Sequence, residues 1–329
     1  MSSRPTVYVD DRRTGDHGIA RFAREVLARL PARVGTPVRR LPVRGSATTP
    51  SDCVRPGRLR PGARDVILSP GSNAGPSRAR QLVTVHDLIH LDDGSRLKRL
   101  YYERVVRPQI VRTGRVLTVS EASRAAIEDW LGARAAAVDV EVVGNGCSRA
   151  FTPEGAAEVF ARPTLALVSN AKAHKNVEVV FDALARCPEL GMVVVGPSPE
   201  AMAGLAAGAG VSDRVDIRSG VPDDELARLY RGTVALLMPS TREGFGLPVL
   251  EAMSCGTRVV HWAGCAPVAE IAAGTGIAVG AAHDPGEWAE AMEKAAATGG
   301  SPCLPAAWGR RYDWDLVADR VARVVRDLV

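Results

Sequence analysis

The stretch EGFGLPVLEAM, Glu243 to Met253, decides how this chain folds, because it joins an apolar strand to a helix through a glycine-rich turn. The run VALLM at 234–238 predicts the strand. Pro248 suits the first position of a helix, where its missing N–H costs nothing, and Gly256 predicts the helix end. Gly246 lets the backbone approach a ligand closely. We therefore expect a ligand-binding turn at the carboxyl end of a strand.

Two glutamates flank this turn. Glu243 is expected in the loop and Glu251 in the first turn of the helix. The unpaired N–H groups of a helix start, with the helix dipole, bind phosphate, while carboxylates accept hydrogen bonds from sugar hydroxyls. The pattern therefore points to a nucleoside diphosphate sugar. A capping Glu251 beside a surface Glu243 remains an open alternative.

The chain around this stretch alternates strand-like and helical segments. Its 329 residues suit two domains of about 150 residues. Alternating strands and helices imply parallel sheets, so we expect two doubly wound α/β domains, separated by a linker at 151–163. The expected strands are 6–9, 66–68, 82–85, 116–119, 164–168, 192–195, 215–218, 234–238 and 257–261. Residues 41–65 predict an irregular excursion, and Ser120 is expected to cap a helix.

Composition excludes several classes of protein. The hydrophobic fraction of 46% supports folded cores, and no apolar run is long enough to span a bilayer. The amino terminus does not resemble a signal peptide, so we expect a cytoplasmic protein. The six cysteines form no C-x-x-C pair and are expected to be free thiols. The pair Asp313 and Asp315 opens the last helix, where it is expected to act structurally and not to bind metal.

Charge is distributed unevenly along the chain. Residues 1–163 carry 27 basic and 17 acidic residues, a net charge of +10, whereas the whole chain carries +5. We expect this basic half to favour an anionic or membrane-associated acceptor, and we expect the protein to bind peripherally at the inner membrane surface. A merely arginine-rich solvated face is the alternative. Its irregular stretch contains Arg39, Arg40, Arg44, Arg55, Arg58, Arg60 and Arg64.

The motifs together resemble those of family-four retaining glycosyltransferases, which have the GT-B fold. EGFGLPVLE is similar to the E-x7-E motif of that family. The resemblance covers most of the chain and is weakest at 35–65. It extends to VTVHDLIHL, LTVSEASR, VVGNG, HKN, GVPDDELARLYRGTVALLMPS and RYDWDLVADRVARVV, in the family's order.

This resemblance implies a fold and an activity. The implied fold is GT-B: residues 1–155 form an acceptor-binding Rossmann-like domain, 156–308 a nucleotide-sugar-binding Rossmann-like domain, and 309–329 a helix that packs back on the first domain. The implied reaction transfers a hexose or deoxyhexose from a nucleoside diphosphate sugar to an acceptor hydroxyl. It retains the configuration at the anomeric carbon and needs no metal or other cofactor. The sequence indicates no nucleic-acid partner.

The resemblance also implies roles for individual residues. Glu251 would hold the ribose hydroxyls of the donor, and Glu243 would contact the transferred sugar. The backbone of Phe245, Gly246 and Leu247 would touch sugar and phosphate.

The segment SNAKAHKN, residues 169–176, holds two of the four lysines of the chain. Positive charge is needed as the bond between diphosphate and sugar breaks. Lys175 matches the family lysine that supplies this charge, and Lys172 is expected to bind the donor. Members of the family usually carry an arginine in this segment, but this chain has none. Either Lys172 substitutes for it or the phosphate is neutralised less.

Three further positions are candidates for the site. His86 ends a strand, and the resemblance implies that it faces the transferred sugar. Gly18 precedes a helix, and its backbone is expected to border the diphosphate, although GIAR replaces the usual GIGR. Gly196 follows MVVV and is expected to line the nucleotide pocket, with an ordinary turn as the alternative.

Three other functions compete with glycosyl transfer. The missing arginine motivates a non-catalytic relative that binds a nucleotide sugar or glycan. A nicotinamide oxidoreductase on two doubly wound domains is disfavoured, because no G-x-G-x-x-G follows a strand. A GT-B nucleotide-sugar epimerase is the third. The donor base, the donor sugar and the acceptor are not specified by the sequence.

Overall fold

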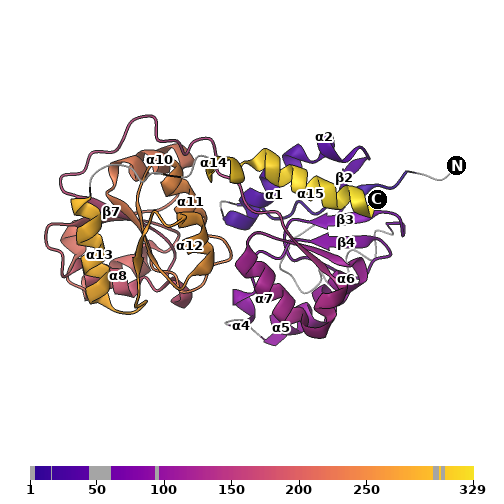
Figure 1. The fold of residues 1–329 in the computed structure, drawn as a ribbon, viewed down its shortest axis with the longest axis horizontal. Helices are drawn as coiled ribbons and strands as arrows, with labels where there is room; N and C mark the ends of the chain where they lie inside the picture. The colour runs from indigo at the N-terminus through magenta and orange to yellow at the C-terminus, as the bar shows by residue number, and fades with distance from the viewer. Residues whose placement is uncertain (1–3, 16, 44–60, 93–95, 299–303, 305–307) are drawn as a thin grey trace. The chain divides into compact units, whose positions relative to one another are not determined.

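The chain folds into two compact units of α/β structure, each built on parallel strands (Figure 1). The computed structural model describes residues 4–15, 17–43, 61–92, 96–298, 304 and 308–329. Unit 1 comprises Met1–Gly146 with Arg310–Val329, and unit 2 comprises Cys147–Gly309. The short helix α14 (Trp308–Arg311) lies at the second boundary.

Unit 1 contains six described strands and the helices that connect them. The strands are β1 (Val7–Val9), β2 (Val38–Arg40), β3 (Val66–Ser69), β4 (Arg80–Val83), β5 (Arg115–Thr118) and β6 (Asp139–Val142). The α-helices are α1 (Gly18–Arg29), α2 (Pro31–Val34), α4 (Ile89–Asp92), α5 (Arg96–Tyr101), α6 (Arg107–Thr113), α7 (Glu121–Leu131) and α15 (Trp314–Leu328). A π-helix, η2 (Tyr102–Val106), joins α5 to α6, and a 3₁₀ helix, η3 (Gly132–Ala137), follows α7.

The strands of unit 1 are all parallel. Four of them are ordered β2-β1-β3-β4, and a parallel bridge between Thr84 and Leu117 connects β4 to the pair β5-β6. Ser120 caps α7 by accepting the N–H of Ser123, as the sequence predicts. α6 and α7 pack against β4, β5 and β6 (Figure 1), and their apolar faces form one core with these strands.

The last helix, α15, packs beside α1 and α2 of unit 1 (Figure 1). Eight of its fifteen residues are buried, so it contributes a full apolar face. Arg33 of α2 donates to Asp315 at 2.5 Å and to Asp319 at 2.7 Å on this helix. Gly146 leaves room for the Trp314 ring, because a Cβ at that position would lie 2.5 Å from it. Packing and ion pairs together fix α15 on unit 1.

Unit 2 contains a second parallel sheet. Its strands are β7 (Thr164–Val168), β8 (Gly191–Val195), β9 (Val215–Arg218), β10 (Ala235–Met238), β11 (Val259–Trp262) and β12 (Ile277–Val279). Its α-helices are α8 (Glu178–Leu184), α9 (Pro199–Gly208), α10 (Asp223–Gly232), α11 (Leu247–Ser254), α12 (Ala266–Ala272) and α13 (Pro285–Ala297). Two 3₁₀ helices, η4 (Ala173–Lys175) and η5 (Ser212–Arg214), lie in the connections.

The sheet of unit 2 has the order β12-β11-β10-β7-β8-β9, with every pair parallel. α8 and α13 lie on one side of it, and α11 and α12 lie on the other (Figure 1). The fully buried Trp288 of α13 packs in the same core as Phe181 of α8. The segment 151–163 makes its contacts inside unit 2, where Arg231 donates to the carbonyls of Thr152 and Ala156.

Candidate functional site

The order of the strands in unit 2 indicates a candidate ligand site. The chain leaves β7 toward β8 on one side and leaves β10 toward β11 on the other, while β7 and β10 are neighbours. Two adjacent strands whose connections diverge leave a crevice at their carboxyl ends, which is the usual ligand site of a doubly wound sheet. Residues 169–176 follow β7, and residues 239–246 follow β10. The two loops that the sequence singles out therefore meet at this point.

The structure brings Lys175 and Glu243 together across these loops. Lys175 Nζ donates to Glu243 Oε1 at 2.7 Å, and the side chains are only 19% and 11% exposed. The loops are also tied by their backbones, because Thr241 donates to the His174 carbonyl through its N–H at 2.8 Å and its hydroxyl at 3.1 Å. We call the place where the connections from β7 and β10 diverge the switch point. A cation and a carboxylate are thus held side by side there, partly shielded from water.

Asn176, which sequence analysis did not select, holds this arrangement. Its φ of 50° lies in the left-handed region, which asparagine tolerates better than most residues. Its Nδ2 donates to the carbonyls of Ala282 at 2.7 Å and Pro239 at 3.3 Å. Its Oδ1 accepts from His283 Nδ1 at 2.9 Å. Asn176 therefore connects the loops after β7, β10 and β12 directly beside Lys175.

The turn before α11 has the expected glycine requirement. Gly246 caps the helix with φ 111° and ψ 51°, a conformation that side-chain-bearing residues rarely adopt, and a Cβ there would lie 3.3 Å from Val268. Phe245 is buried, and Leu247 is half-buried at the first helical position. As predicted, Gly256 follows the helix in the left-handed conformation, with φ 78°.

The position of Glu251 differs from the expectation. The helix begins at Leu247 and not at Pro248, so Glu251 is the fifth helical residue and lies beyond the first turn. The cause is that Gly246 occupies the capping position, and proline is tolerated equally at the second helical position, whose N–H also lacks an intrahelical acceptor. Glu251 is 5% exposed. A carboxylate buried this far requires polar partners.

Two other candidates of unit 2 have different surroundings. Lys172 is exposed, and its ammonium group makes no hydrogen bond or ion pair to any residue that the structure describes. Its carbonyl accepts the N–H of Lys175. Gly196 is required by packing, because a Cβ there would lie 1.9 Å from the carbonyl oxygen of Ser169. The backbones after β7 and β8 therefore approach closely, whether or not a ligand is bound.

In unit 1, His86 lies at the end of the extended segment that continues β4. It is 8% exposed, its Nε2 donates to the Pro70 carbonyl at 2.9 Å, and the Phe22 ring meets its edge at 5.0 Å between centroids. Burial lowers the pKa of His86 below its usual value, so the ring is neutral at pH 7. Gly18 is the first residue of α1, directly after the capping residue His17.

A buried polar cluster follows β1 and β3 in unit 1, and sequence analysis did not predict it. Arg12 binds Asp10 at 2.7 Å, Asn73 Nδ2 approaches Asp10 Oδ2 at 3.4 Å, and Arg13 donates to Asn73 at 3.2 Å. Burial acts to raise the pKa of Asp10, but the hydrogen bond and charge of Arg12 outweigh it and hold that pKa below its usual value. The signal was present in DDRR, which directly follows the first apolar strand.

The described residues also bear on metal binding, disulfides and membrane-spanning helices. Within the described ranges, no group of three or more His, Cys, Asp or Glu side chains could hold a metal ion. Asp313 caps α15 by accepting the N–H of Asp315. The four cysteines in the described part of the chain are free thiols. Among the described helices, none is long and apolar enough to cross a membrane.

The basic stretch of the first half is only partly described. Arg39 and Arg40 are exposed on β2, and Arg40 pairs with Asp11. Arg64 is exposed after the excursion. Arg44, Arg55, Arg58 and Arg60 lie outside the described residues.

Comparison with known proteins matches the unit that holds the Lys175–Glu243 pair. Residues 154–302 match the family described as Glycosyl transferases group 1. The D-inositol 3-phosphate glycosyltransferase of Mycolicibacterium smegmatis is 34% identical over 159 residues, which are 44% of this chain and 36% of that protein. A second such enzyme, from Frankia alni, is 39% identical over 108 residues, 31% of this chain and 26% of the enzyme. The chain thus spans about a third of the length of the curated relatives it matches.

Solved structures match nearly the whole chain. A sucrose-phosphate synthase from Thermosynechococcus elongatus superposes with a TM-score of 0.70 over 99% of both chains, at 17% identity. Anabaena HepE, solved with UDP and glucose, gives 0.67 over 97% of this chain and 98% of HepE, at 16% identity. The fold is GT-B. The predicted fold class is therefore confirmed, and the sequence matches support a GT-B glycosyltransferase.

Proposed function

We propose that this protein is a retaining glycosyltransferase that moves a hexose or deoxyhexose from a nucleoside diphosphate sugar to an acceptor hydroxyl. The observation that carries the proposal is the Lys175–Glu243 pair at the switch point of the unit 2 sheet. A diphosphate leaving group needs a cation, and a transferred sugar offers hydroxyls to a carboxylate. One charged pair supplies both groups at one place.

Each residue around the pair has a role in this proposal. Lys175 stabilises the charge that grows on the diphosphate as the sugar bond lengthens, and Glu243 accepts hydrogen bonds from the sugar. Glu251 holds the ribose hydroxyls. The backbone at Phe245, Gly246 and Leu247 approaches sugar and phosphate, and the start of α11 adds oriented N–H groups. Lys172, exposed in the same loop, is a secondary phosphate contact.

The relatives support a nucleotide-sugar donor. HepE was solved with UDP and glucose and also with UDP-glucose, and it shares the fold of this chain. The curated relatives are named as glycosyltransferases acting on D-inositol 3-phosphate. That name describes a phosphorylated acceptor, which agrees with the expectation of an anionic acceptor for the basic first half of this chain.

Unit 1 supplies the acceptor side in this proposal. The pKa of His86 is lowered, so its ring is neutral at pH 7, and a hydrogen bond to the Pro70 carbonyl holds the ring in place; its proposed role is to contact the sugar. Arg13 follows β1 and offers a cation to an anionic acceptor, whereas the charge of Arg12 is already paired with Asp10. The retaining step proceeds without metal, and the departing phosphate helps to deprotonate the acceptor hydroxyl.

The proposal is tested in two steps with the purified protein. A thermal-shift screen against UDP, GDP, TDP, ADP and their sugars identifies the base, since a ligand at 100 times its Kd adds about 2.7 kcal/mol of stability. Donor turnover is then followed by product analysis, with the anomeric configuration read by NMR. Binding without any transfer or donor hydrolysis would favour the non-catalytic relative, and inversion would refute the retaining mechanism. Stabilisation by no nucleotide would refute the donor site.

A further inference from the structure

The helix α5 of unit 1 exposes apolar and basic side chains together. All six of its residues are described, and none of them is buried. Leu97 is 76% exposed and Leu100 is 52% exposed, and they lie three residues apart, on one face of the helix. Arg96 and Lys98 lie beside them and are also exposed. Tyr101, the last residue of the helix, packs partly against the core of unit 1, but the two leucines do not, so the core does not explain their presence.

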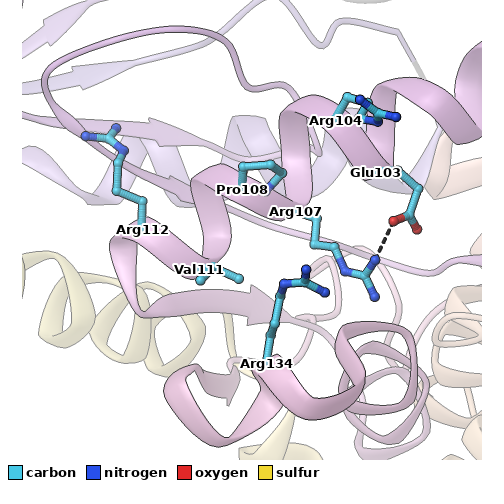
Figure 2. A pocket seen from close by; sticks show the side chains of 7 residues that line it. All are labelled: Glu103, Arg104, Arg107, Pro108, Val111, Arg112 and Arg134. Carbon is cyan, nitrogen blue, oxygen red and sulfur yellow. Dashed lines mark hydrogen bonds and ion pairs between the residues drawn. The ribbon is translucent and has the colours of Figure 1, made fainter.

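A basic hollow lies on η2, α6 and η3, and η2 directly follows α5 in the chain. The hollow has a volume of about 520 Å³, and four arginines line it with one carboxylate, Glu103 (Figure 2). Arg107 pairs with that carboxylate, whereas Arg112 donates to the carbonyls of Arg78 and Ala79 and keeps its charge uncompensated. Arg104 and Arg134 are exposed, and no carboxylate pairs with either one in the described part of the chain.

This region is held firmly on unit 1. The Tyr101 hydroxyl donates to the Ala74 carbonyl at 2.9 Å and accepts the Ala74 N–H at 2.8 Å. Arg99 donates to the Leu91 carbonyl at 2.7 Å. The Arg107 guanidinium stacks over the Trp130 ring at 5.3 Å from its centroid. These contacts hold α5 in place on unit 1, so a partner could bind the exposed leucines without first ordering the helix.

We propose that this face docks on the surface of an anionic lipid bilayer. We call it the α5 face and define it as Arg96, Leu97, Lys98, Leu100, Arg104 and Arg134. Leucines enter the boundary between headgroups and acyl chains, while arginine and lysine side chains reach the phosphates. The charge is complementary to anionic headgroups, and each cation at such a surface strengthens binding about fivefold. A nucleic acid would use the cations but would leave the two aliphatic side chains exposed to water.

The α5 face differs from the basic surface expected from the sequence. That expectation rests on the stretch from Arg39 to Arg64, whereas the α5 face lies on a later segment that also carries the apolar side chains. The proposal goes beyond glycosyl transfer and does not depend on it, because the surface lies on helices and not at the ends of the strands of unit 2. Its test needs no nucleotide sugar.

Vesicle sedimentation with the whole protein tests the proposal. Wild type should bind phosphatidylglycerol vesicles at low salt, bind several-fold less at high salt, and ignore pure phosphatidylcholine vesicles. Leu97→Ser with Leu100→Ser should weaken binding about tenfold. Arg96→Gln with Arg104→Gln should weaken it about 25-fold, since each cation contributes about fivefold. Melting temperatures should match wild type, because these side chains are exposed.

Matched controls distinguish binding by the α5 face from nonspecific binding by other exposed apolar side chains and other positive charges. Leu316→Ser with Val159→Ser removes two exposed apolar side chains elsewhere, which are 42% and 93% exposed. Arg24→Gln with Arg149→Gln removes the same charge from other surfaces. Both controls should bind vesicles within about threefold of wild type. Failure of wild type to bind anionic vesicles would overturn the proposal, as would leucine variants that bind like wild type. A dimer in gel filtration that the leucine substitutions abolish would identify the face instead as an interface between copies.

Discussion

Substitution of Glu243 by Gln tests the central pair most directly. Glu243 neutralises Lys175 at 2.7 Å, and both side chains are mostly shielded from water. A bound diphosphate needs the same ammonium group, so it must compete with the carboxylate and also lies near its negative charge. Removing that charge should therefore improve binding of a free nucleoside diphosphate, while a donor sugar loses an acceptor for its hydroxyls.

The expected size follows from the exposure of the pair. Two charges at this distance attract by about 6 kcal/mol at an effective dielectric constant of 20, before desolvation is subtracted. Fully exposed pairs contribute about 0.2–1 kcal/mol net, and breaking fully buried pairs costs about 3–5 kcal/mol. With side chains 19% and 11% exposed, we expect about 1 kcal/mol. Free nucleotide should therefore bind Glu243→Gln about fivefold tighter than wild type.

Turnover should move in the opposite direction. Losing one preorganised contact to the reacting groups typically costs about 10²–10³ in turnover. Glu243→Gln should therefore bind free nucleotide more tightly and transfer sugar far more slowly. Lys175→Ala should lower single-turnover rates by a similar factor while weakening donor binding less, because charge on the diphosphate grows in the transition state. The helix start at α11 still supplies N–H groups to the phosphate in this variant.

Calorimetry with the free nucleotide and single-turnover kinetics with the donor measure both quantities. Glu290→Gln is the control for charge, because it removes an exposed carboxylate of α13 in the same unit. Lys172→Ala is the control for Lys175→Ala, since Lys172 is exposed in the same loop. Equal loss of free-nucleotide and donor affinity in Glu243→Gln would refute the shared-lysine argument. A crippled Lys172→Ala beside a normal Lys175→Ala would show that Lys172 is the phosphate ligand.

Four further predictions follow. Glu251→Ala should weaken donor and free nucleoside diphosphate alike in calorimetry, because the ribose is common to both; loss of donor affinity alone would refute the ribose role. Asn176→Gly keeps the left-handed backbone but loses three hydrogen bonds, so it should lower kcat about tenfold with KM within about threefold of wild type. Asn176→Ala should in addition lower the free energy of unfolding by about 1 kcal/mol. A normal kcat in Asn176→Gly would exclude a positioning role for Asn176. Activity should survive EDTA within about twofold, because a lysine stabilises the leaving group; tenfold dependence on added Mg²⁺ or Mn²⁺ would contradict it. Burial lowers the pKa of His86, so the unfolded chain binds its proton first and Tm should fall as pH drops from about 7 to 5; His86→Gln should flatten this slope, and an unchanged slope would refute it.

Most of the strands that the sequence revealed share one property, and the edge strand β9 at 215–218 is an exception with partly exposed residues. Those at 66–69, 164–168, 191–195 and 235–238 are apolar runs buried on both faces, as parallel strands between helices must be. The structure confirms them within one or two residues. The strands β2, β6 and β12 were not predicted, because they are short edge strands with partly exposed residues. Such strands form because a neighbouring strand offers them hydrogen bonds, which is a tertiary effect.

The candidate site divides in a similar way. The sequence could select Lys175, Glu243 and Glu251 because their segments resemble motifs of a known family, in a chain where lysine is scarce and a glycine turn separates the two carboxylates. It could not select Asn176, whose three side-chain partners come from loops more than 60 residues away in the chain. Gly196 was selected for a nucleotide pocket, yet the Ser169 carbonyl alone already requires glycine there. A glycine in a sequence reports close approach but does not identify the approaching group.

The strand order of unit 2 explains why Lys175 and Glu243 meet although 68 residues separate them. β7 and β10 are paired in register, Leu167 beside Leu237, so the first residues after each strand leave the sheet at neighbouring points. From these points the chain runs in opposite directions along the sheet, toward β8 and toward β11. The two loops therefore lie next to each other at the carboxyl ends of the strands. Asn176 and the His174 carbonyl fasten that contact with hydrogen bonds from three connections. Charge placement therefore follows from sheet topology first and from side-chain packing second.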